Sequence, residues 1–589
     1  MELENDFSES KWDKFILICK PEQSGKTFIM IQEIIKQLSN NENKNINIIN
    51  IIFCDNSLLL TKQTGNRIQE NLSEYKSSLD NISNDEEMTT FNIENSKEEY
   101  IEFSSKSKNT NVDSVLGVIT YRKIKNILCC TNGTRTDGIY ELIELINENN
   151  SDKFYFKIWI DEADKYISQI DRVFKPLVDE YNNVNVYCIT ATAKKLFDKY
   201  NYMNVFPLEN TTSSNYHGWE DNRFKKYDMT CSIIEFVNHI LINVVKNDIK
   251  PGTKWFIPAG FKKTSHHEIK DICLRIGFAV IIVNGDGIQL ILPNREVNTY
   301  SKKDILNSTL DEIYIKHELK EYPVVITGNL CIGRGISIMC EKKVDKEGKT
   351  IKNGFMIDYA ILSSTNNAQE TSQLSGRVKG NIKNWINYKR PFVYTTTKFD
   401  KIAKEWEIKS RELARLAYDK ELNGKKTIIT KSEYKTLGED YQYIVHEELF
   451  TSYKEALNFL KRKDIEKQMR KKVNGEKRKE KIQYEKNSPI HRRLKEPLPN
   501  DKKNQPKNGY ALTSKLVTKQ KPLETMTQDD RITYDKAINP NSEGYIAPGR
   551  CISSTSNGSR YLILPIYETM ETPAKNEKYQ VRYISFKKK

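Results

Sequence analysis

A short segment between an apolar run and a helical pattern constrains the fold of this chain most strongly. The run Phe15–Ile18 precedes Lys20-Pro21-Glu22-Gln23-Ser24-Gly25-Lys26-Thr27, and helical apolar spacing begins at Phe28. A strand that ends in a Gly-Lys-Thr loop at a helix N-terminus presents consecutive backbone N–H groups to an anion. Gly25 permits close backbone approach. Such a turn is typical of the carboxyl edge of a parallel α/β sheet.

The sequence of residues 20–27 resembles a P-loop, although Lys20 occupies the position where the first Gly is common. In a P-loop, Lys26 would reach the β and γ oxygens of ATP, and Thr27 would hold Mg²⁺. The alternative is an ordinary strand–turn–helix with a Gly-Lys-Thr on the surface. We predict ATP binding by all eight residues, Lys20, Pro21, Glu22, Gln23, Ser24, Gly25, Lys26 and Thr27.

A second apolar strand ends in an acidic cluster, Ile158-Trp159-Ile160-Asp161-Glu162-Ala163-Asp164. ATP hydrolysis needs one carboxylate near Mg²⁺ and another that orients or deprotonates the attacking water. Asp161 fits the metal and nucleotide role, and Glu162 fits the catalytic one. The alternative is an acidic loop after a strand. Because both motifs follow strands, the pair favours one ATP site at the same sheet edge.

The rest of the chain predicts an α/β fold with two tandem parallel-sheet domains. Apolar strands alternate with helical patterns in two series, which is typical of parallel α/β layers. Residues 402–485 are charged and helical in pattern, and four prolines between 486 and 508 indicate a linker. The predicted boundaries are a first domain at 1–212 with a polar insertion near 70–112, a second domain at 213–400, a charged helical region at 401–485, a linker at 486–508, and a small β-rich unit at 509–589.

The chain resembles the superfamily 2 helicases, which include the DEAD-box proteins. Residues 161–164 have the sequence Asp-Glu-Ala-Asp (DEAD). Thr190-Ala191-Thr192 resembles the motif that couples ATP hydrolysis to domain movement. The resemblance implies a coupling role for Thr190 and Thr192. It also implies that Arg135, after another strand, contacts the nucleic-acid backbone.

The later motifs of this family follow in order. Residues 325–337 resemble motif V, with Gly335, and Gln373-Leu374-Ser375-Gly376-Arg377-Val378-Lys379-Gly380 resembles motif VI. The resemblance implies two RecA-like domains with ATP between them, where the second supplies Gly335, Gln373 and the arginine finger Arg377. Gly380 stands where the family usually has its last Arg, so Lys379 or Arg334 could compensate. Catalysis is thus assigned to Lys26, Glu162 and Arg377.

One basic segment accounts for most of the net charge of +14. Residues 461–496, the basic segment, hold 15 Lys and Arg against 6 Asp and Glu. Clustered cations favour phosphate contact, whereas the alternative is a solvated helix with internal Glu–Lys pairs. We predict nucleic-acid contacts there at Lys471, Lys472, Arg478 and Lys479.

Composition narrows the class of protein further. The 589 residues contain no run of 18 apolar residues, which disfavours a transmembrane span. Ten cysteines without a C-x-x-C pair disfavour zinc ribbons and disulfide frameworks and favour a reducing compartment. The acidic start without an apolar stretch predicts no signal peptide. We expect an intracellular protein of cytoplasm or nucleus, without a membrane partner. The Asn- and Lys-rich composition is similar to that of helicases of large DNA viruses with AT-rich genomes. A viral origin would place the protein in the host cell or the virion.

The resulting hypothesis is an ATP- and Mg²⁺-dependent helicase or translocase that acts on DNA or RNA. One alternative is an ATP-gated nucleic-acid clamp or assembly factor without processive unwinding. Another is the motor subunit of a nuclease system, with a protein partner bound by the C-terminal third. Tyr216-His217-Gly218-Trp219, between the two domains, would either stack on adenine or nucleic acid or form a packed linker.

Overall fold

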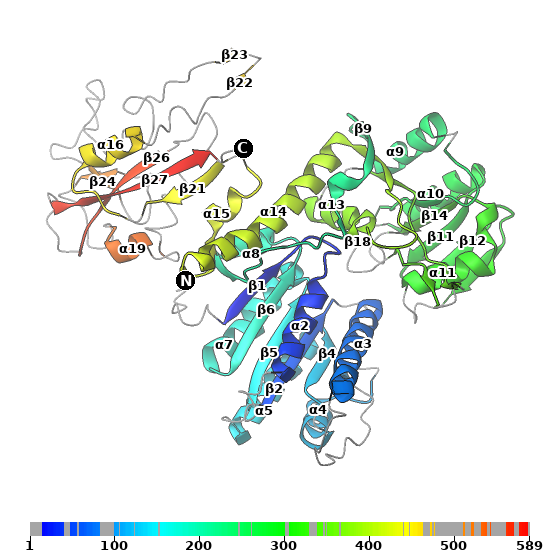
Figure 1. Cartoon of the computed structure of the whole chain (residues 1–589), viewed down its shortest axis with the longest axis horizontal. Helices are drawn as coiled ribbons and strands as arrows, with labels where there is room; N and C mark the ends of the chain where they lie inside the picture. The colour runs from blue at the N-terminus through cyan, green and yellow to red at the C-terminus, as the bar shows by residue number, and fades with distance from the viewer. Residues whose placement is uncertain are drawn as a thin grey trace. The chain divides into compact units, whose positions relative to one another are not determined.

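The computed structural model divides the chain into two compact units, residues 1–195 with 204–427, and residues 196–203 with 428–589 (Figure 1). The structure describes residues 14–39, 47–55, 58–82, 99–104, 107–122, 124–150, 154–245, 248–260, 262–300, 306–328, 338–345, 348, 350–363, 367–439, 441–446, 448–462, 472–473, 476–477, 510–512, 520–522, 532–538, 542, 561–569 and 576–586.

The first domain is a parallel sheet that the sequence builds from short, almost fully apolar strands. Strands buried on both faces need apolar side chains at every position, and helices must then cover both faces. The strand order is β7 (Tyr202–Val205), β1 (Phe15–Cys19), β6 (Val184–Thr190), β5 (Phe154–Asp161), β2 (Asn47–Cys54), β4 (Asn126–Cys130) and β3 (Ile101–Phe103). The covering helices include α2 (Lys26–Ser39), α3 (Leu58–Ile82), α5 (Gly133–Asn150) and α7 (Lys175–Glu180).

The second domain repeats this plan and adds antiparallel strands at one edge. Its order is β13 (Val297–Tyr300), β12 (Gly287–Ile291), β11 (Ala279–Asn284), β14 (Val324–Gly328), β10 (Lys254–Phe256), β17 (Tyr359–Leu362), β19 (Phe392–Thr396) and β9 (Arg223–Tyr227). The β11–β12 and β12–β13 pairs are antiparallel, and the others are parallel. Its helices include α9 (Ile233–His239), α10 (Lys263–Arg275), α11 (Leu306–Lys316) and α13 (Ala368–Ser375).

These two sheets confirm the predicted α/β fold with two tandem RecA-like domains. The long helix α14 (Thr397–Leu422) then contacts both domains of this unit. Its N-terminal part packs near β19, α13 and β9, and it also packs on β1. Farther along, the backbone carbonyl of Ala414 accepts a hydrogen bond from the Leu208 N–H at 3.2 Å. The two RecA-like domains are therefore joined by a helix as well as by their direct contacts.

The other unit contains the predicted C-terminal β structure. An antiparallel sheet orders β21 (Tyr441–Val445), β27 (Lys578–Phe586) and β26 (Tyr561–Ile566). The helix α16 (Tyr453–Arg462) packs on this sheet through Tyr453, Ala456 and Leu460. The stretch 401–485 contains not only α14, α15 (Lys431–Lys435) and α16 but also β20 (Ile428–Thr430) and β21. The predicted charged helical region therefore also contains strands, because β21 pairs with a strand more than 130 residues later.

The predicted polar insertion near 70–112 begins inside α3 and includes β3, which pairs in parallel with β4. Residues 83–98 lie outside the described residues. The basic segment does so as well, apart from the first residues of the segment in α16 and the short strands β22 (Lys472–Val473) and β23 (Glu476–Lys477).

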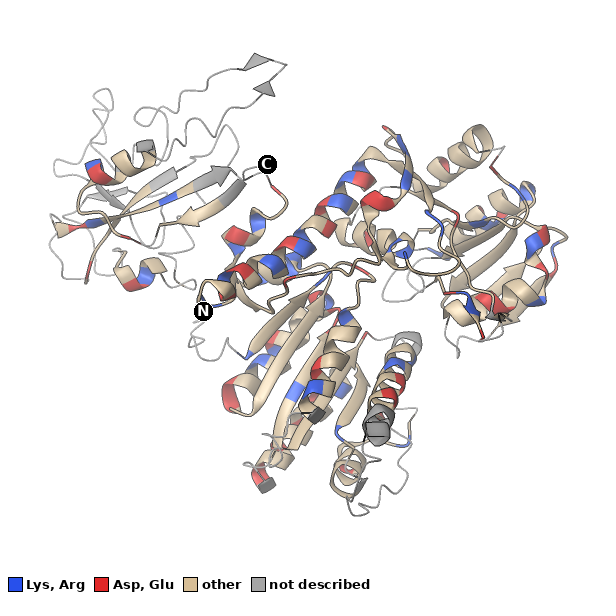
Figure 2. Cartoon of the chain, in the orientation of Figure 1, with Lys and Arg blue, Asp and Glu red and all other residues tan. Residues whose placement is uncertain are grey.

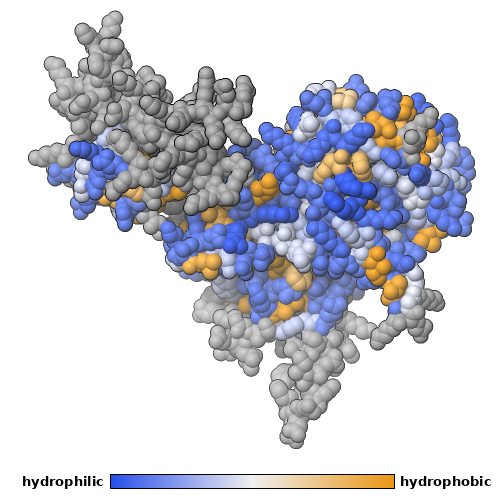
Figure 3. Space-filling model, turned by 45° about the horizontal axis from the view of Figure 1, so that its top comes forward, coloured by the Kyte–Doolittle hydropathy of each residue, from blue (hydrophilic) through white to orange (hydrophobic). Residues whose placement is uncertain are grey.

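The described surface carries both signs of charge. Figure 2 shows Lys and Arg interspersed with Asp and Glu along α14. Hydrophilic residues cover most of the described part of the face in Figure 3, with scattered hydrophobic patches. Within the described ranges, no helix combines the length and apolarity needed to cross a bilayer.

Candidate nucleotide site

One cavity of about 380 Å³ brings together residues from both RecA-like domains. It lies at the carboxyl edge of the first sheet, where β1 and β5 end. The second domain closes it with α13 and with the 3₁₀ turn η8 (Gly376–Val378). The predicted residues that line it are Glu22, Gln23, Gly25, Lys26, Thr27, Asp161, Glu162, Gln373 and Arg377.

The loop between β1 and α2 lines one part of this cavity with Glu22, Gln23 and Gly25. Gly25 has φ +92°, a conformation that side chains disfavour. Gln23 also adopts a positive φ, 57°, so the loop is bent over several residues. Lys26 is the first residue of α2, so it stands at the helix end whose first N–H groups lack intrahelical partners. This geometry suits the anionic phosphates of a nucleotide.

Two carboxylates stand opposite this loop at the end of β5. Burial, with the nearby charge of Glu162, raises the pKa of Asp161 to about 7. Glu162 is 2% exposed and has φ 53°, which costs about 1–3 kcal/mol of backbone strain for a residue with a side chain. Gln373 of the second domain donates a hydrogen bond to the Glu162 carboxylate at 3.1 Å. The strained acid is thus held by a residue of the facing domain.

Arg377 brings a buried cation to the same cavity. Its side chain belongs to a residue only 2% exposed, and burial lowers its pKa to about 10, so it stays charged at neutral pH. The Nε and Nη1 atoms have no hydrogen-bond partner among the described residues. A buried guanidinium with unused donors is costly unless an anion completes it. This supports a phosphate oxygen as its partner.

The residues present fit ATP with Mg²⁺. The cavity offers the Thr27 hydroxyl and the Asp161 carboxylate, which are oxygen ligands of the kind that Mg²⁺ prefers. Lys26 supplies positive charge from the first domain, and Arg377 supplies it from the second. The donor set therefore matches an anionic nucleotide and a hard cation.

Not every predicted nucleotide residue lines this cavity. Lys20, Pro21 and Ser24 are buried and absent from the lining. The Ser24 hydroxyl instead donates to the Pro21 carbonyl at 2.7 Å, which shapes the loop. Burial, together with the charge of Lys26, lowers the pKa of Lys20 to about 8. Gly335 and Arg334 lie outside the described residues.

Thr190 and Thr192 lie at the end of β6, next to the acidic cluster. Their hydroxyls donate to the two oxygens of Asp164 at 2.7 and 3.0 Å. Gln369 of α13 reaches Thr192 across the domains at 3.3 Å. The two threonines therefore connect the acidic motif with the second domain, as a coupling element requires, and the coupling role stays a prediction.

Arg135 is not brought to the cavity. Its guanidinium donates to the Thr110 carbonyl at 2.8 Å and lies 4.5 Å from the centre of the Phe103 ring. Among the predicted basic residues, Lys471, Arg478 and Lys479 lie outside the described residues, and Lys472 is described only as part of β22. The nucleic-acid roles of these residues stay predictions.

The segment between the domains forms a packed linker. Tyr216 is 3% exposed and Trp219 is fully buried. The His217 ring nitrogens lie within hydrogen-bond distance of Tyr388 and Asn222, at 2.9 and 3.0 Å. Stacking on a ligand would require exposed rings, so the packed alternative is confirmed over the stacking one.

Several residues that line the cavity belong to no motif that could be recognised in the sequence. Arg67 and Asn71 come from α3, and Phe28 and Ile31 come from α2. Ile338, Met339, Asn381, Ile382 and Trp385 come from the second domain. Arg67 belongs to no motif, although its place on the helix after β2 is where a residue can face the strand ends.

Comparison with protein families gives one match. Residues 3–196 match the family described as "Type III restriction enzyme, res subunit". This span contains the loop of residues 20–27, the acidic cluster and Thr190 to Thr192. The match supports a helicase-like ATPase motor domain in this part of the chain. The search of curated proteins found no match.

Solved structures of helicases are similar at low identity. A DEAD-box protein from Methanococcus jannaschii is 16% identical, covering 67% of this chain and 85% of that chain, with a TM-score of 0.30. The helicase Lhr of Mycobacterium smegmatis, bound to single-stranded DNA and AMP-PNP, is 9% identical, covering 69% and 46%, with a TM-score of 0.36. A DEAD-box helicase bound to single-stranded RNA and UDP-BeF is 12% identical, covering 66% and 67%, with a TM-score of 0.35.

Proposed function

We propose that this chain is an ATP-dependent helicase or translocase of superfamily 2, which acts on DNA or RNA. The observation that carries the proposal is the meeting of Lys26, Glu162 and Arg377 around one cavity. These three residues come from distant parts of the sequence and from two domains. Each has the side-chain chemistry that ATP hydrolysis needs at its position.

In this proposal Lys26 and the α2 N-terminus hold the phosphates, and Glu162 orients the attacking water. Arg377 stabilises the negative charge that develops on the transferred phosphoryl group. Mg²⁺, held by Thr27 and Asp161, would screen the phosphate charges when bound. Closure of the domains on ATP completes the site, and opening after hydrolysis moves the two domains relative to each other. Thr190 and Thr192 would pass this change from the acidic motif to α13.

The nucleic-acid part of the proposal is supported by the order of the motifs and by the basic segment. A motor that moves along a strand needs contacts with the sugar–phosphate backbone rather than with bases. An intracellular location follows from this role, and viral origin stays a prediction from the Asn- and Lys-rich composition.

ATP turnover tests the proposal directly. The purified chain should hydrolyse ATP, and single- or double-stranded DNA or RNA should stimulate the rate. Lys26→Ala should abolish turnover, since it removes the ammonium at the start of α2. Glu162→Gln should bind ATP but not hydrolyse it, because an amide cannot act as a base. Normal turnover in a folded Lys26→Ala variant would contradict the site assignment.

A second candidate is the motor subunit of a nuclease system. The observation that favours it is the match of residues 3–196 to the res subunit of type III restriction enzymes. Strand displacement on a tailed duplex separates a helicase from an ATP-gated clamp, which would show stimulated ATPase activity alone. Nuclease activity that co-purifies with the chain would favour the nuclease system.

A further inference from the structure

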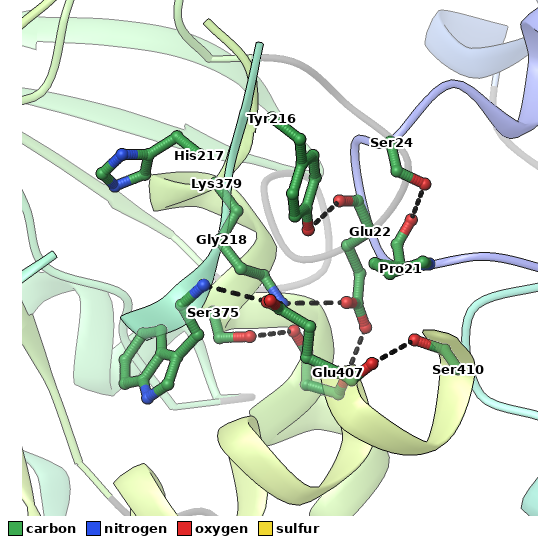
Figure 4. Close-up of polar contacts among 12 residues, drawn as sticks. Pro21, Glu22, Ser24, Tyr216, His217, Gly218, Ser375, Lys379, Glu407 and Ser410 are labelled. Carbon is green, nitrogen blue, oxygen red and sulfur yellow. Dashed lines mark hydrogen bonds and ion pairs between the residues drawn. The ribbon is translucent and has the colours of Figure 1, made fainter. Parts of the chain in front are cut away.

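A buried ionic cluster joins the loop between β1 and α2 (residues 20–25, here called the nucleotide loop) to the second domain (Figure 4). Lys379, whose side chain is fully buried, lies 3.0 Å from the Glu22 carboxylate and 3.3 Å from the Glu407 carboxylate. Glu22 belongs to the loop before Lys26, and Glu407 belongs to α14. Lys379 therefore bridges the first domain and the helix that follows the second.

The charges in this cluster are satisfied by further contacts. The Ser372 hydroxyl donates to the other oxygen of Glu22. Glu407 accepts from the Trp219 backbone N–H at 2.9 Å and pairs with Arg411 at 2.7 Å. Removal of a buried charge from such a set leaves the others unpaired, which is strongly unfavourable.

The protonation states agree with this geometry. Burial alone would raise the pKa of Glu22, but the ammonium groups of Lys379 and Lys26 outweigh it and lower the pKa below its ordinary value. Burial alone would lower the pKa of Lys379, but Glu22 and Glu407 outweigh it and raise the pKa. Glu22 and Lys379 are therefore both charged at neutral pH.

Two further contacts bring the loop close to the second domain. The Tyr216 hydroxyl donates to the Glu22 backbone carbonyl at 3.0 Å. A Cβ placed on Gly376 would lie 2.7 Å from the Glu22 Cβ. The backbone of the 3₁₀ turn η8 therefore lies so close to Glu22 that a residue with a Cβ would clash at position 376.

We propose that Lys379 is a positioning residue, which holds Glu22 and thereby sets the distance between the nucleotide loop and Arg377. Lys379 lies two residues after Arg377, and Glu22 lies four residues before Lys26. A contact between Lys379 and Glu22 thus fixes the two cationic sides of the cavity relative to each other. Since two carboxylates already hold its ammonium, Lys379 serves the proposed ATPase through placement and not as an arginine finger. This inference rests on the proposed function.

The first test separates catalysis from binding. Lys379→Met should lower kcat for ATP by about a hundredfold, the effect expected when reacting groups are misplaced by about 1 Å. The KM for ATP should change less than about threefold, because Lys26 and the helix N-terminus remain. The matched control is Lys263→Met, which removes an exposed Lys–Asp pair of 2.7 Å in the same domain and should leave kcat unchanged. A wild-type kcat in Lys379→Met would overturn the proposal.

The second test asks whether the two residues act together. Glu22→Gln and Lys379→Met should each slow turnover, and the double variant should be no slower than the worse single variant, since both changes break one contact. The triple variant Glu22→Gln/Lys379→Met/Glu407→Gln replaces the three buried members of the cluster by uncharged side chains. Arg411 loses its Glu407 partner, but its side chain is 40% exposed and water can solvate it. The triple variant should fold and remain slow. Recovery of the triple variant to within about threefold of wild type would show that charge repulsion, and not positioning, caused the loss.

A third measurement does not depend on hydrolysis. Spectroscopic labels introduced at positions 36 and 320, which are exposed in the first and second domains, report the distance between the domains. In the full chain, Lys379→Met should lengthen this distance or broaden the distribution of distances, and Lys263→Met should change neither. An unchanged distance would overturn the proposal. If the wild-type chain hydrolyses no ATP, the proposed function fails, while the label distance still decides the role of Lys379.

Discussion

Gly376→Ala should separate the structural and the catalytic roles of the motif around Arg377. The added Cβ would lie 2.7 Å from the Glu22 Cβ, whereas ordinary contacts are 3.4–4 Å. One of the two backbones must therefore move by about 0.7 Å, the difference between 3.4 and 2.7 Å. Glu22 cannot yield easily, because Lys379, Ser372 and Tyr216 all hold it.

A displacement of this size changes catalysis more than folding. Misplacement of reacting groups by about 1 Å costs about a hundredfold in rate, so kcat for ATP should fall by about ten- to a hundredfold. Gly376 has φ −61°, which alanine adopts freely, so the backbone itself is not strained. Steady-state ATPase assays and thermal unfolding of the full chain measure the two effects.

The matched control for this substitution is Gly117→Ala. Gly117 ends α4 (Val112–Gly117), and a Cβ there meets no atom within 4 Å. Its kcat should equal that of wild type. A Gly376→Ala variant with wild-type kcat would refute the reasoning, because it would mean that the two domains need not approach this closely during turnover.

Three further predictions concern the proposed metal carboxylate Asp161, the proposed arginine finger Arg377 and the basic segment. Burial and Glu162 raise the pKa of Asp161 to about 7 from its ordinary 3.8, so between these pH values the nucleotide-free folded chain binds a proton that the unfolded chain has lost. The free energy of unfolding should therefore fall as pH rises from about 4 through 7. Asp161→Asn should flatten this pH dependence in thermal unfolding, and an equal dependence in the variant and the wild type would contradict the prediction. Arg377→Ala should leave nucleotide binding largely intact and lower kcat by about 10³-fold or more, whereas a loss below about tenfold would assign the finger to another residue. Neutralising the four predicted basic residues of the basic segment should reduce the log–log salt slope of oligonucleotide binding by about 0.7–0.9 per lost phosphate contact, and an unchanged slope would favour a solvated segment.

The sequence predicted the parts of the site that depend on local pattern. The P-loop and the acidic cluster each combine an apolar strand with a few fixed residues, and parallel strands bring their carboxyl ends to one edge. Asp161, Glu162 and Lys26 could therefore be placed together without coordinates. Gln373 and Arg377 could be named through the order of the family's motifs.

The remaining features depend on contacts between distant segments. Glu22 and Lys379 are 357 residues apart, and no pattern in either segment indicates a pair. Glu407 lies on a charged helix where any carboxylate would look solvated. The strand β21 lies within the predicted charged helical region for a related reason: its partner strand β27 is far away in the sequence, and no local pattern indicates the pairing. Sequence periodicity reports which face is apolar, but it does not report which partner covers that face.

The glycine at position 380 departs from the motif VI pattern of the superfamily 2 helicases that the chain resembles. The resemblance leads one to expect an arginine there, but Gly380 has φ +141°, a conformation that side chains rarely adopt. A Cβ at this position would also lie 3.3 Å from the Gln23 Cβ of the nucleotide loop. An arginine would thus require a different backbone at the point where the second domain touches that loop. The nearest cation, Lys379, is already bound by two carboxylates. In this arrangement a close contact with the loop before Lys26 stands where the resemblance implies a second cation. Under the proposed function, Arg377 alone would then stabilise the charge that develops during hydrolysis.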